Sequence, residues 1–82
     1  MVIEVTREDI SASQRRHCWK CPIARAVSRK TGQTAIVAYD AVLLGDRRTP
    51  LPAAAIAWMW AFDEDGTVEP FTFELEIEPR RT

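Results

Sequence analysis

The two cysteines of the chain, Cys18 and Cys21, are separated by two residues, Trp and Lys. A Cys-x-x-Cys pair at the start of a helix is typical of thiol–disulfide sites, because the helix dipole and nearby cations lower thiol pKa values. Arg16, His17 and Lys20 would supply such cations. Thioredoxin-like folds place the pair directly after a buried strand, whereas about twelve residues separate it from the first predicted strand here. A redox role is therefore only an alternative.

Zinc binding is the second chemistry that this pair could support. A structural zinc ion needs four ligands, and the chain offers only Cys18, Cys21 and His17. Neighbouring His17 and Cys18 side chains rarely reach one metal ion together. Two chains could instead share a site of four thiolates, so a dimer-shared zinc module stays open beside the redox role. The simplest expectation is one buried cysteine and one without a role, with no metal and no cofactor.

Other catalytic patterns are missing from the sequence. His17 is the only histidine and falls in a predicted loop, and no serine stands in a Gly-x-Ser-x-Gly context. The three glycines are too scattered to build a phosphate-binding loop. Glu74, Glu76 and Glu78 follow the solvent side of a predicted strand, which is typical of a solvated surface. We therefore expect that the protein is not an enzyme.

The charged residues are unevenly distributed, although the formal net charge is only −1. Residues 63–78 contain seven acidic side chains and no basic one, whereas residues 15–30 contain six basic side chains and no acidic one. Basic groups around an aromatic ring can bind phosphates and stack on bases, so residues 15–30 form a candidate nucleic-acid surface. The acidic stretch would repel phosphate, which makes nucleic-acid binding the alternative. The candidate residues are Arg15, Arg16, Trp19, Lys20, Arg25, Arg29 and Lys30.

Length and hydropathy place the chain among small cytoplasmic domains. A length of 82 residues allows one domain, over residues 1–82, with a single core. No stretch approaches the roughly 18 apolar residues of a membrane span, and the N-terminal sequence lacks the pattern of a signal peptide. We therefore expect a cytoplasmic location, in which the cysteines stay reduced.

Local patterns along the chain predict an α+β fold. Thr6 is a suitable N-cap for a short first helix, Pro22 suits the first turn of a second helix, and Gly32 suits its end. The expected architecture is a three- to four-stranded antiparallel sheet covered on one face by two helices, with the first and last strands adjacent. The predicted elements are a strand over 2–5, a short helix over 7–13, a helix from 22 to a stop at 32, one or two strands over 34–44, a polar turn over 45–48, a helix over 53–62 and a strand over 71–78.

The last strand shows strict alternation of apolar and polar residues, which predicts one buried and one solvated face. Its expected core residues are Phe71, Phe73, Leu75 and Ile77.

The predicted third helix is apolar around its whole circumference. Trp58 falls on the side of Leu51, Ala55, Met59 and Phe62, which should pack on the last strand. A helix that is apolar all round is normally buried all round, which is hard to achieve in so small a chain. The second side could be covered by the neighbouring helix or by another chain. The candidate partner-binding residues on that second side are Trp60, Ile56, Ala53 and Ala57.

Three stretches of the sequence resemble a known family. They are Cys-Pro-Ile-Ala-Arg-Ala over 21–26, Leu-Pro at 51–52 leading to Ala-Phe-Asp at 61–63, and Val-Glu-Pro-Phe-Thr-Phe-Glu-Leu over 68–75. In this order and spacing they resemble small uncharacterised proteins of actinobacteria and their bacteriophages. The resemblance implies a phage or prophage origin, and it implies no activity and no catalytic residue. Our leading expectation is a non-catalytic phage-type interaction protein that binds itself or a host protein.

Overall fold

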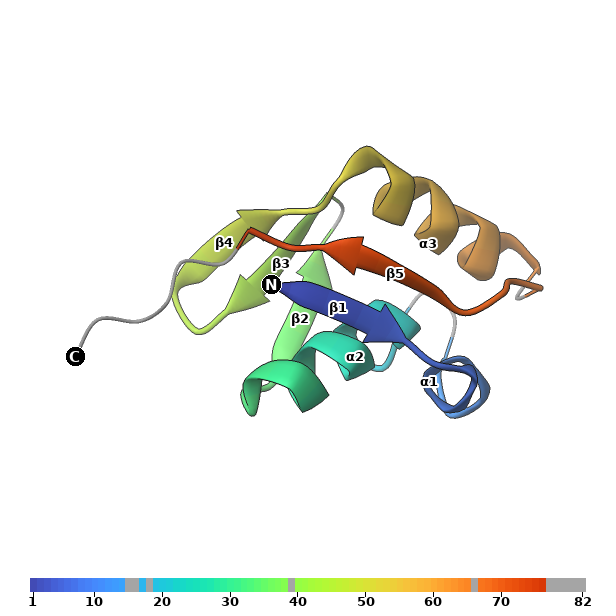
Figure 1. The fold of residues 1–82 in the computed structure, drawn as a ribbon, viewed down its shortest axis with the longest axis horizontal. Coiled ribbons are helices and arrows are strands. Elements are labelled where there is room, and N and C mark those ends of the chain that lie inside the picture. The colour runs from blue at the N-terminus through green and yellow to red at the C-terminus, as the bar shows by residue number, and fades with distance from the viewer. Residues whose placement is uncertain (15–16, 18, 39, 66, 77–82) are drawn as a thin grey trace.

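The computed structural model describes residues 1–14, 17, 19–38, 40–65 and 67–76 of the chain, and these contain three helices and five strands (Figure 1). The α+β class and the short N-terminal helix are therefore confirmed. The elements, in chain order, are β1 (Val2–Val5), α1 (Arg7–Ser11), α2 (Pro22–Thr31), β2 (Ala35–Ala38), β3 (Ala41–Leu44), β4 (Arg47–Pro50), α3 (Ala53–Asp65) and β5 (Phe71–Glu74).

The first and last strands pair with each other, as expected. β1 and β5 are antiparallel, with Ile3 opposite Phe73 and Val5 opposite Phe71. Beyond the end of β5, the N–H of Leu75 donates to the carbonyl of Met1 at 2.8 Å. Ile3, Val5, Phe73 and Leu75 are buried, so the alternation in the sequence gives the correct inner face. Ile77, which was also assigned to this face, lies outside the described residues.

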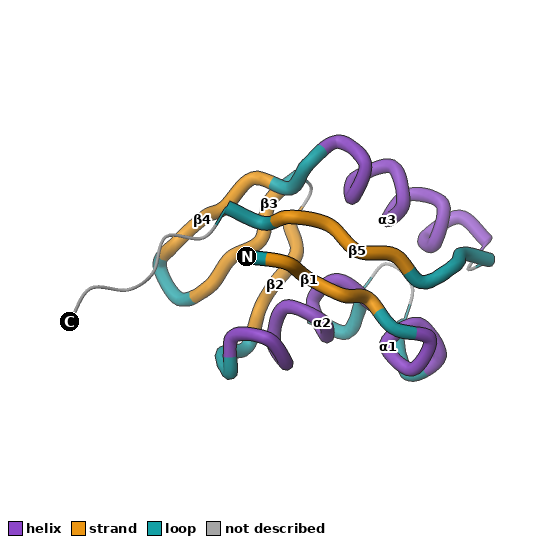
Figure 2. Tube along the Cα trace, viewed as in Figure 1, coloured by secondary structure: helices purple, strands orange, loops and turns teal. Residues whose placement is uncertain are grey.

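The other three strands form a sheet of their own, with the order β2-β3-β4. β2 and β3 divide at Asp40, where the sequence indicated a break. The expectation of a single sheet is wrong, because β1 and β5 pair only with each other within the described residues (Figure 2).

The polar turn predicted over residues 45–48 is longer than the turn in the structure. Only Gly45 and Asp46 turn the chain, with Gly45 at a φ of 62° that favours glycine, and β4 follows at once.

Helix α2 begins and ends at the residues that the sequence indicated, whereas α1 begins at the predicted Arg7 but ends at Ser11, two residues before the predicted end. The Thr6 hydroxyl accepts from the N–H of Asp9, and the Asp9 carboxylate accepts from the N–H of Thr6, which completes a capping box. Pro22 stands in the first turn of α2, and Gly32 ends this helix at a φ of 75°. α2 contacts β1 and β2, so it joins the two sheets instead of covering one face of a single sheet.

The core lies where α2, α3 and the inner sides of both sheets meet. Its α2 residues include Ile23 and Val27, and α3 contributes Ala55 and Met59. α3 extends three residues beyond the predicted end, through the acidic residues 63–65, and in Figure 1 it runs alongside β5. This arrangement leaves one side of α3 without a neighbour among the described elements.

Candidate functional site

The inner side of α3 packs on aromatic residues of β5. The indole ring of Trp58 stacks on the ring of Phe71, with centroids 4.5 Å apart, and also lies parallel to Phe62 at 6.1 Å. Phe71 in turn stacks on Phe73 at 5.3 Å. The Trp58 indole N–H donates to the carbonyl of Glu69 at 2.8 Å, so the polar end of this ring is satisfied. Trp58 is therefore the inward tryptophan, as the helical spacing predicted.

The opposite side of α3 carries an exposed tryptophan. Trp60 is 70% exposed, and at 100° per residue it lies about 200° around the helix from Trp58. Ala53 and Ala57, the other predicted surface residues, are exposed as well. The neighbouring helix α2 therefore does not cover this side.

One residue assigned to this surface belongs elsewhere. Ile56 is half-buried and packs against the core cluster, because it lies at the margin of the exposed arc and its longer side chain turns inward. Ala54 and Ala61 are exposed and take its place. Their position on the helical wheel could have identified them, since both lie within about 60° of Ala57, whereas Ile56 lies about 100° away. We refer below to Ala53, Ala54, Ala57, Trp60 and Ala61 as the outer α3 face.

The outer α3 face is apolar, and acidic residues follow it only in the last turn of the helix. No charged residue occurs between positions 53 and 61. Asp63 and Glu64 follow in the last turn, and the first turn has no acidic residue. Apolar atoms at the centre and charged groups at one end are typical of a surface that binds protein, and the face offers no group for catalysis.

Cys21 is buried at the start of α2. It is the N-cap residue of α2, and its Sγ accepts from the N–H of Ala24 at 3.3 Å. Burial raises the pKa of the Cys21 thiol to about 11, because the hydrogen bonds from the helix start do not compensate for lost solvation. The lowered thiol pKa expected for a redox pair is therefore wrong for Cys21. Cys18 lies outside the described residues.

Metal ligands do not gather in the described part of the chain. No group of three His, Cys, Asp or Glu side chains within it could hold an ion. The ring of His17 instead meets the ring of Trp19 edge to face, with centroids 4.7 Å apart.

The basic segment, residues 15–30, presents several exposed side chains, and one of them forms an ion pair within the protein. Trp19 is 54% exposed, and Lys20, Arg25 and Lys30 are exposed too. Arg29 donates to the buried carboxylate of Asp9 and holds it as an ion pair. Arg15 and Arg16, also assigned to the nucleic-acid surface, lie outside the described residues.

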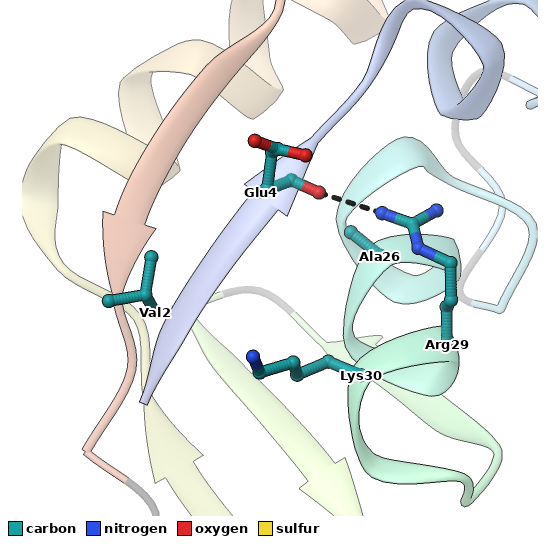
Figure 3. A pocket seen from close by; sticks show the side chains of 5 residues that line it. All are labelled: Val2, Glu4, Ala26, Arg29 and Lys30. Carbon is teal, nitrogen blue, oxygen red and sulfur yellow. Dashed lines mark hydrogen bonds between the residues drawn. The ribbon is translucent and has the colours of Figure 1, made fainter.

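A pocket of about 440 Å³ opens between β1 and α2 (Figure 3), lined by Val2, Glu4, Ala26, Arg29 and Lys30. Arg29 crosses it, and its second amino group donates to the carbonyl of Glu4 at 2.8 Å. This contact satisfies a carbonyl on the edge of β1 that points away from β5. A charged side chain laid along a strand edge protects the edge from pairing with other chains. Arg29, which lines this pocket, is therefore engaged in a contact that stabilises the fold.

The chain gives no match in comparisons with known proteins: no family model, no curated protein and no solved structure is significantly similar to it. No helix within the described residues is long and apolar enough to cross a membrane.

Proposed function

We propose that this chain is a non-catalytic interaction protein, of the phage type that its sequence resembles, and that it binds a protein partner through the outer α3 face. The observation that carries the proposal is the exposure of Trp60, at 70%, among four exposed alanines. Contiguous exposed apolar patches mark interaction sites on monomeric proteins. Tryptophan is also enriched among the residues that dominate interface energies.

The binding free energy that burial of Trp60 would contribute supports this role. A covered tryptophan buries roughly 150–250 Å², and each Å² of apolar area removed from water contributes roughly 25 cal/mol. Covering the exposed part of Trp60 would therefore contribute a few kcal/mol before the costs of association. The alanines around it lose no side-chain rotamer freedom on binding, which keeps those costs low.

The state of Cys21 supports a non-catalytic role. A catalytic or redox thiol acts as thiolate, and burial raises the pKa of this thiol to about 11. Asp9, the buried acid among the described residues, is likewise committed to a capping box and to Arg29.

The test compares wild-type protein with Trp60→Ser in two measurements. Sedimentation velocity over a concentration series reports self-association, and affinity capture from a host lysate, read by mass spectrometry, reports a host partner. Arg25→Ser is the matched control, because Arg25 is exposed on a different helix. We expect wild type and Arg25→Ser to bind themselves or a specific protein, and Trp60→Ser to lose that binding. If the three proteins behave alike in both measurements, the proposal fails.

Nucleic-acid binding is the second candidate, favoured by the exposure of Trp19 beside Lys20. An exposed ring next to cations can stack on a single-stranded base while the cations bind phosphate. The test is fluorescence anisotropy of a labelled single-stranded DNA over a salt series. If this candidate is correct, wild type binds at low salt and Trp19→Ala binds several-fold more weakly. Absence of binding at 50 mM salt would eliminate it.

A further inference from the structure

The outer α3 face has one large side chain at one end and small ones at the other. Ala53, Ala57 and Trp60 are exposed, and so is Glu64. Their spacing of four, three and four residues is the spacing of the contact seam in a pair of packed helices. Trp60 is the only bulky member of this seam. A surface of this shape fits a partner helix that offers a hollow opposite Trp60 and a bulky group opposite the alanines near the start of α3.

We propose that the partner is a second copy of this chain, with the two α3 helices antiparallel about a two-fold axis at Ala57. This inference rests on the proposed role of the outer α3 face. In a two-fold contact the same patch serves both copies, so it must complement itself. With the axis at Ala57, Trp60 of each copy faces Ala54 of the other, between Ala53 and Ala57. Each tryptophan then fills a hollow formed by three alanines.

The parallel alternative fits the same surface poorly. It would bring Trp60 against Trp60 and hold the backbones apart at the alanines, leaving empty space where contacts are needed. In the antiparallel arrangement the bulky and small positions alternate along the seam. The alanines then let the two backbones approach to the usual 8–10 Å between helix axes.

The charge of α3 also favours antiparallel pairing. The exposed Glu64 lies in the last turn of α3, the negative end of the helix dipole, and the first turn has no acidic residue. Antiparallel pairing places each acidic end beside the positive, N-terminal end of the other helix. Parallel pairing would place the two acidic ends together, where like charges repel. The face is thus complementary to an inverted copy of itself in charge as well as in size.

The length of the helix sets the strength of the contact. A helix of 13 residues is about 20 Å long at 1.5 Å per residue. One such helix buries less than the roughly 800 Å² per partner of a standard stable interface. We therefore infer a weak dimer, which forms as the protein concentration rises and stays in exchange with the monomer.

Cysteine cross-linking tests the arrangement residue by residue. Cysteines link when their Cα atoms lie roughly 4.4–6.8 Å apart, and the two-fold axis brings position 57 of one copy against position 57 of the other. In a Cys18→Ser background, Ala57→Cys alone should therefore form a disulfide dimer under mild oxidation. Ala53→Cys alone and Ala61→Cys alone should not, but a mixture of these two proteins should link as a heterodimer. All three positions are exposed, so the substitutions leave the core intact.

The control is Trp60→Ser added to Ala57→Cys, which should slow the link at least several-fold. Equal linking of Ala53→Cys, Ala57→Cys and Ala61→Cys, each alone, would indicate a parallel or unspecific contact and overturn the arrangement. Absence of any link, with monomeric sedimentation at the highest concentration reached, would also overturn it. If a host protein is then still captured in a manner that requires Trp60, the proposed function stands and only self-pairing fails. If neither is observed, both fail.

Discussion

Arg29 on α2 donates a hydrogen bond to the carboxylate of Asp9 on α1, which is only 2% exposed. The two residues are 20 positions apart in the sequence, and their ion pair ties the short first helix to the second. The other oxygen of Asp9 accepts from the N–H of Thr6 at 2.9 Å. A five-residue helix is too short to be stable alone. We infer that this carboxylate holds α1 in place.

Replacing Asp9 by Asn should therefore destabilise the protein. Asparagine keeps an acceptor for Thr6 but loses the charge that Arg29 faces, and hydrogen bonds to charged groups contribute about 1.5–3 kcal/mol. We expect the free energy of unfolding to fall by about 1–3 kcal/mol in urea denaturation at pH 7. Glu8→Gln, an exposed change in the same turn, is the control and should stay within about 0.5 kcal/mol. Equal stability of the two variants would contradict the role of Asp9.

Stability should also depend on pH through Asp9. Burial alone would raise the pKa of this carboxyl, but the hydrogen bonds from Arg29 and Thr6 outweigh it, so the pKa lies below its ordinary value of 3.8. The folded form therefore binds the proton more weakly than the unfolded chain, and the stabilisation is complete above pH 3.8. It is lost as the pH falls from there through the folded pKa. Urea denaturation between pH 7 and pH 2 should show the gap between wild type and Asp9→Asn closing in this acidic range.

The inner face of β5 gives a second test of stability. Phe73 is buried opposite Ile3 and stacks on Phe71. Phe73→Ala should cost about 3–5 kcal/mol, as large truncations in a core do. Glu74→Gln should be nearly silent, because its contact with the N-terminal ammonium is exposed. Thermal melts measure both, and a similarly small effect of the two changes would mean that the register of this strand is wrong.

The sequence predicts most elements of this fold because their local signals are strong. Thr6, Pro22 and Gly32 stand at helix boundaries for steric and hydrogen-bonding reasons that act within a few residues. β4 was missed because its sequence, Arg-Arg-Thr-Pro, has no apolar alternation and is held by backbone pairing with β3. The division into two sheets depends on α2, which contacts both β1 and β2. Such contacts between distant elements cannot be predicted from the sequence of either strand alone.

The outer α3 face could be predicted only in part. Helical spacing alone separates Trp58 from Trp60, because the two directions differ by about 200°. Ile56 lies at the boundary between the two sides, where spacing cannot decide, and packing against the core draws it inward. The pKa of Cys21 could not be predicted either. A helix start lowers a thiol pKa and burial raises it, and only the structure shows that burial has the larger effect.

The thiol of Cys21 should be unreactive in the folded protein. With a pKa of about 11, only about one molecule in a thousand carries thiolate at pH 8. Alkylation by iodoacetamide, mapped to Cys21 by mass spectrometry, should be slow at pH 8 and should become fast in denaturing urea. Fast alkylation of Cys21 at pH 7 in folded protein would contradict this and revive the redox alternative.

Metal removal should leave the protein unchanged. No three candidate ligands gather within the described residues. The Sγ of Cys21 already accepts a hydrogen bond from the N–H of Ala24. We expect the melting temperature to be the same before and after treatment with a chelator. Elemental analysis of the purified protein is the independent check. Stoichiometric zinc in a dimer would overturn the prediction and make Cys18 and Cys21 the ligands.

Replacement by serine should lower the free energy of unfolding strongly at one tryptophan of α3 and hardly at all at the other. Trp58→Ser removes the ring that stacks on Phe71 and the indole N–H that donates to Glu69, so it should cost about 2–5 kcal/mol, as losses of large packed side chains do. Trp60→Ser removes a ring that is 70% exposed and should change the stability of the monomer by no more than about 0.5 kcal/mol. Urea denaturation at low protein concentration measures both without a contribution from association. If Trp60→Ser unfolds the protein as readily as Trp58→Ser, the outer α3 face is part of the core and cannot be a binding surface.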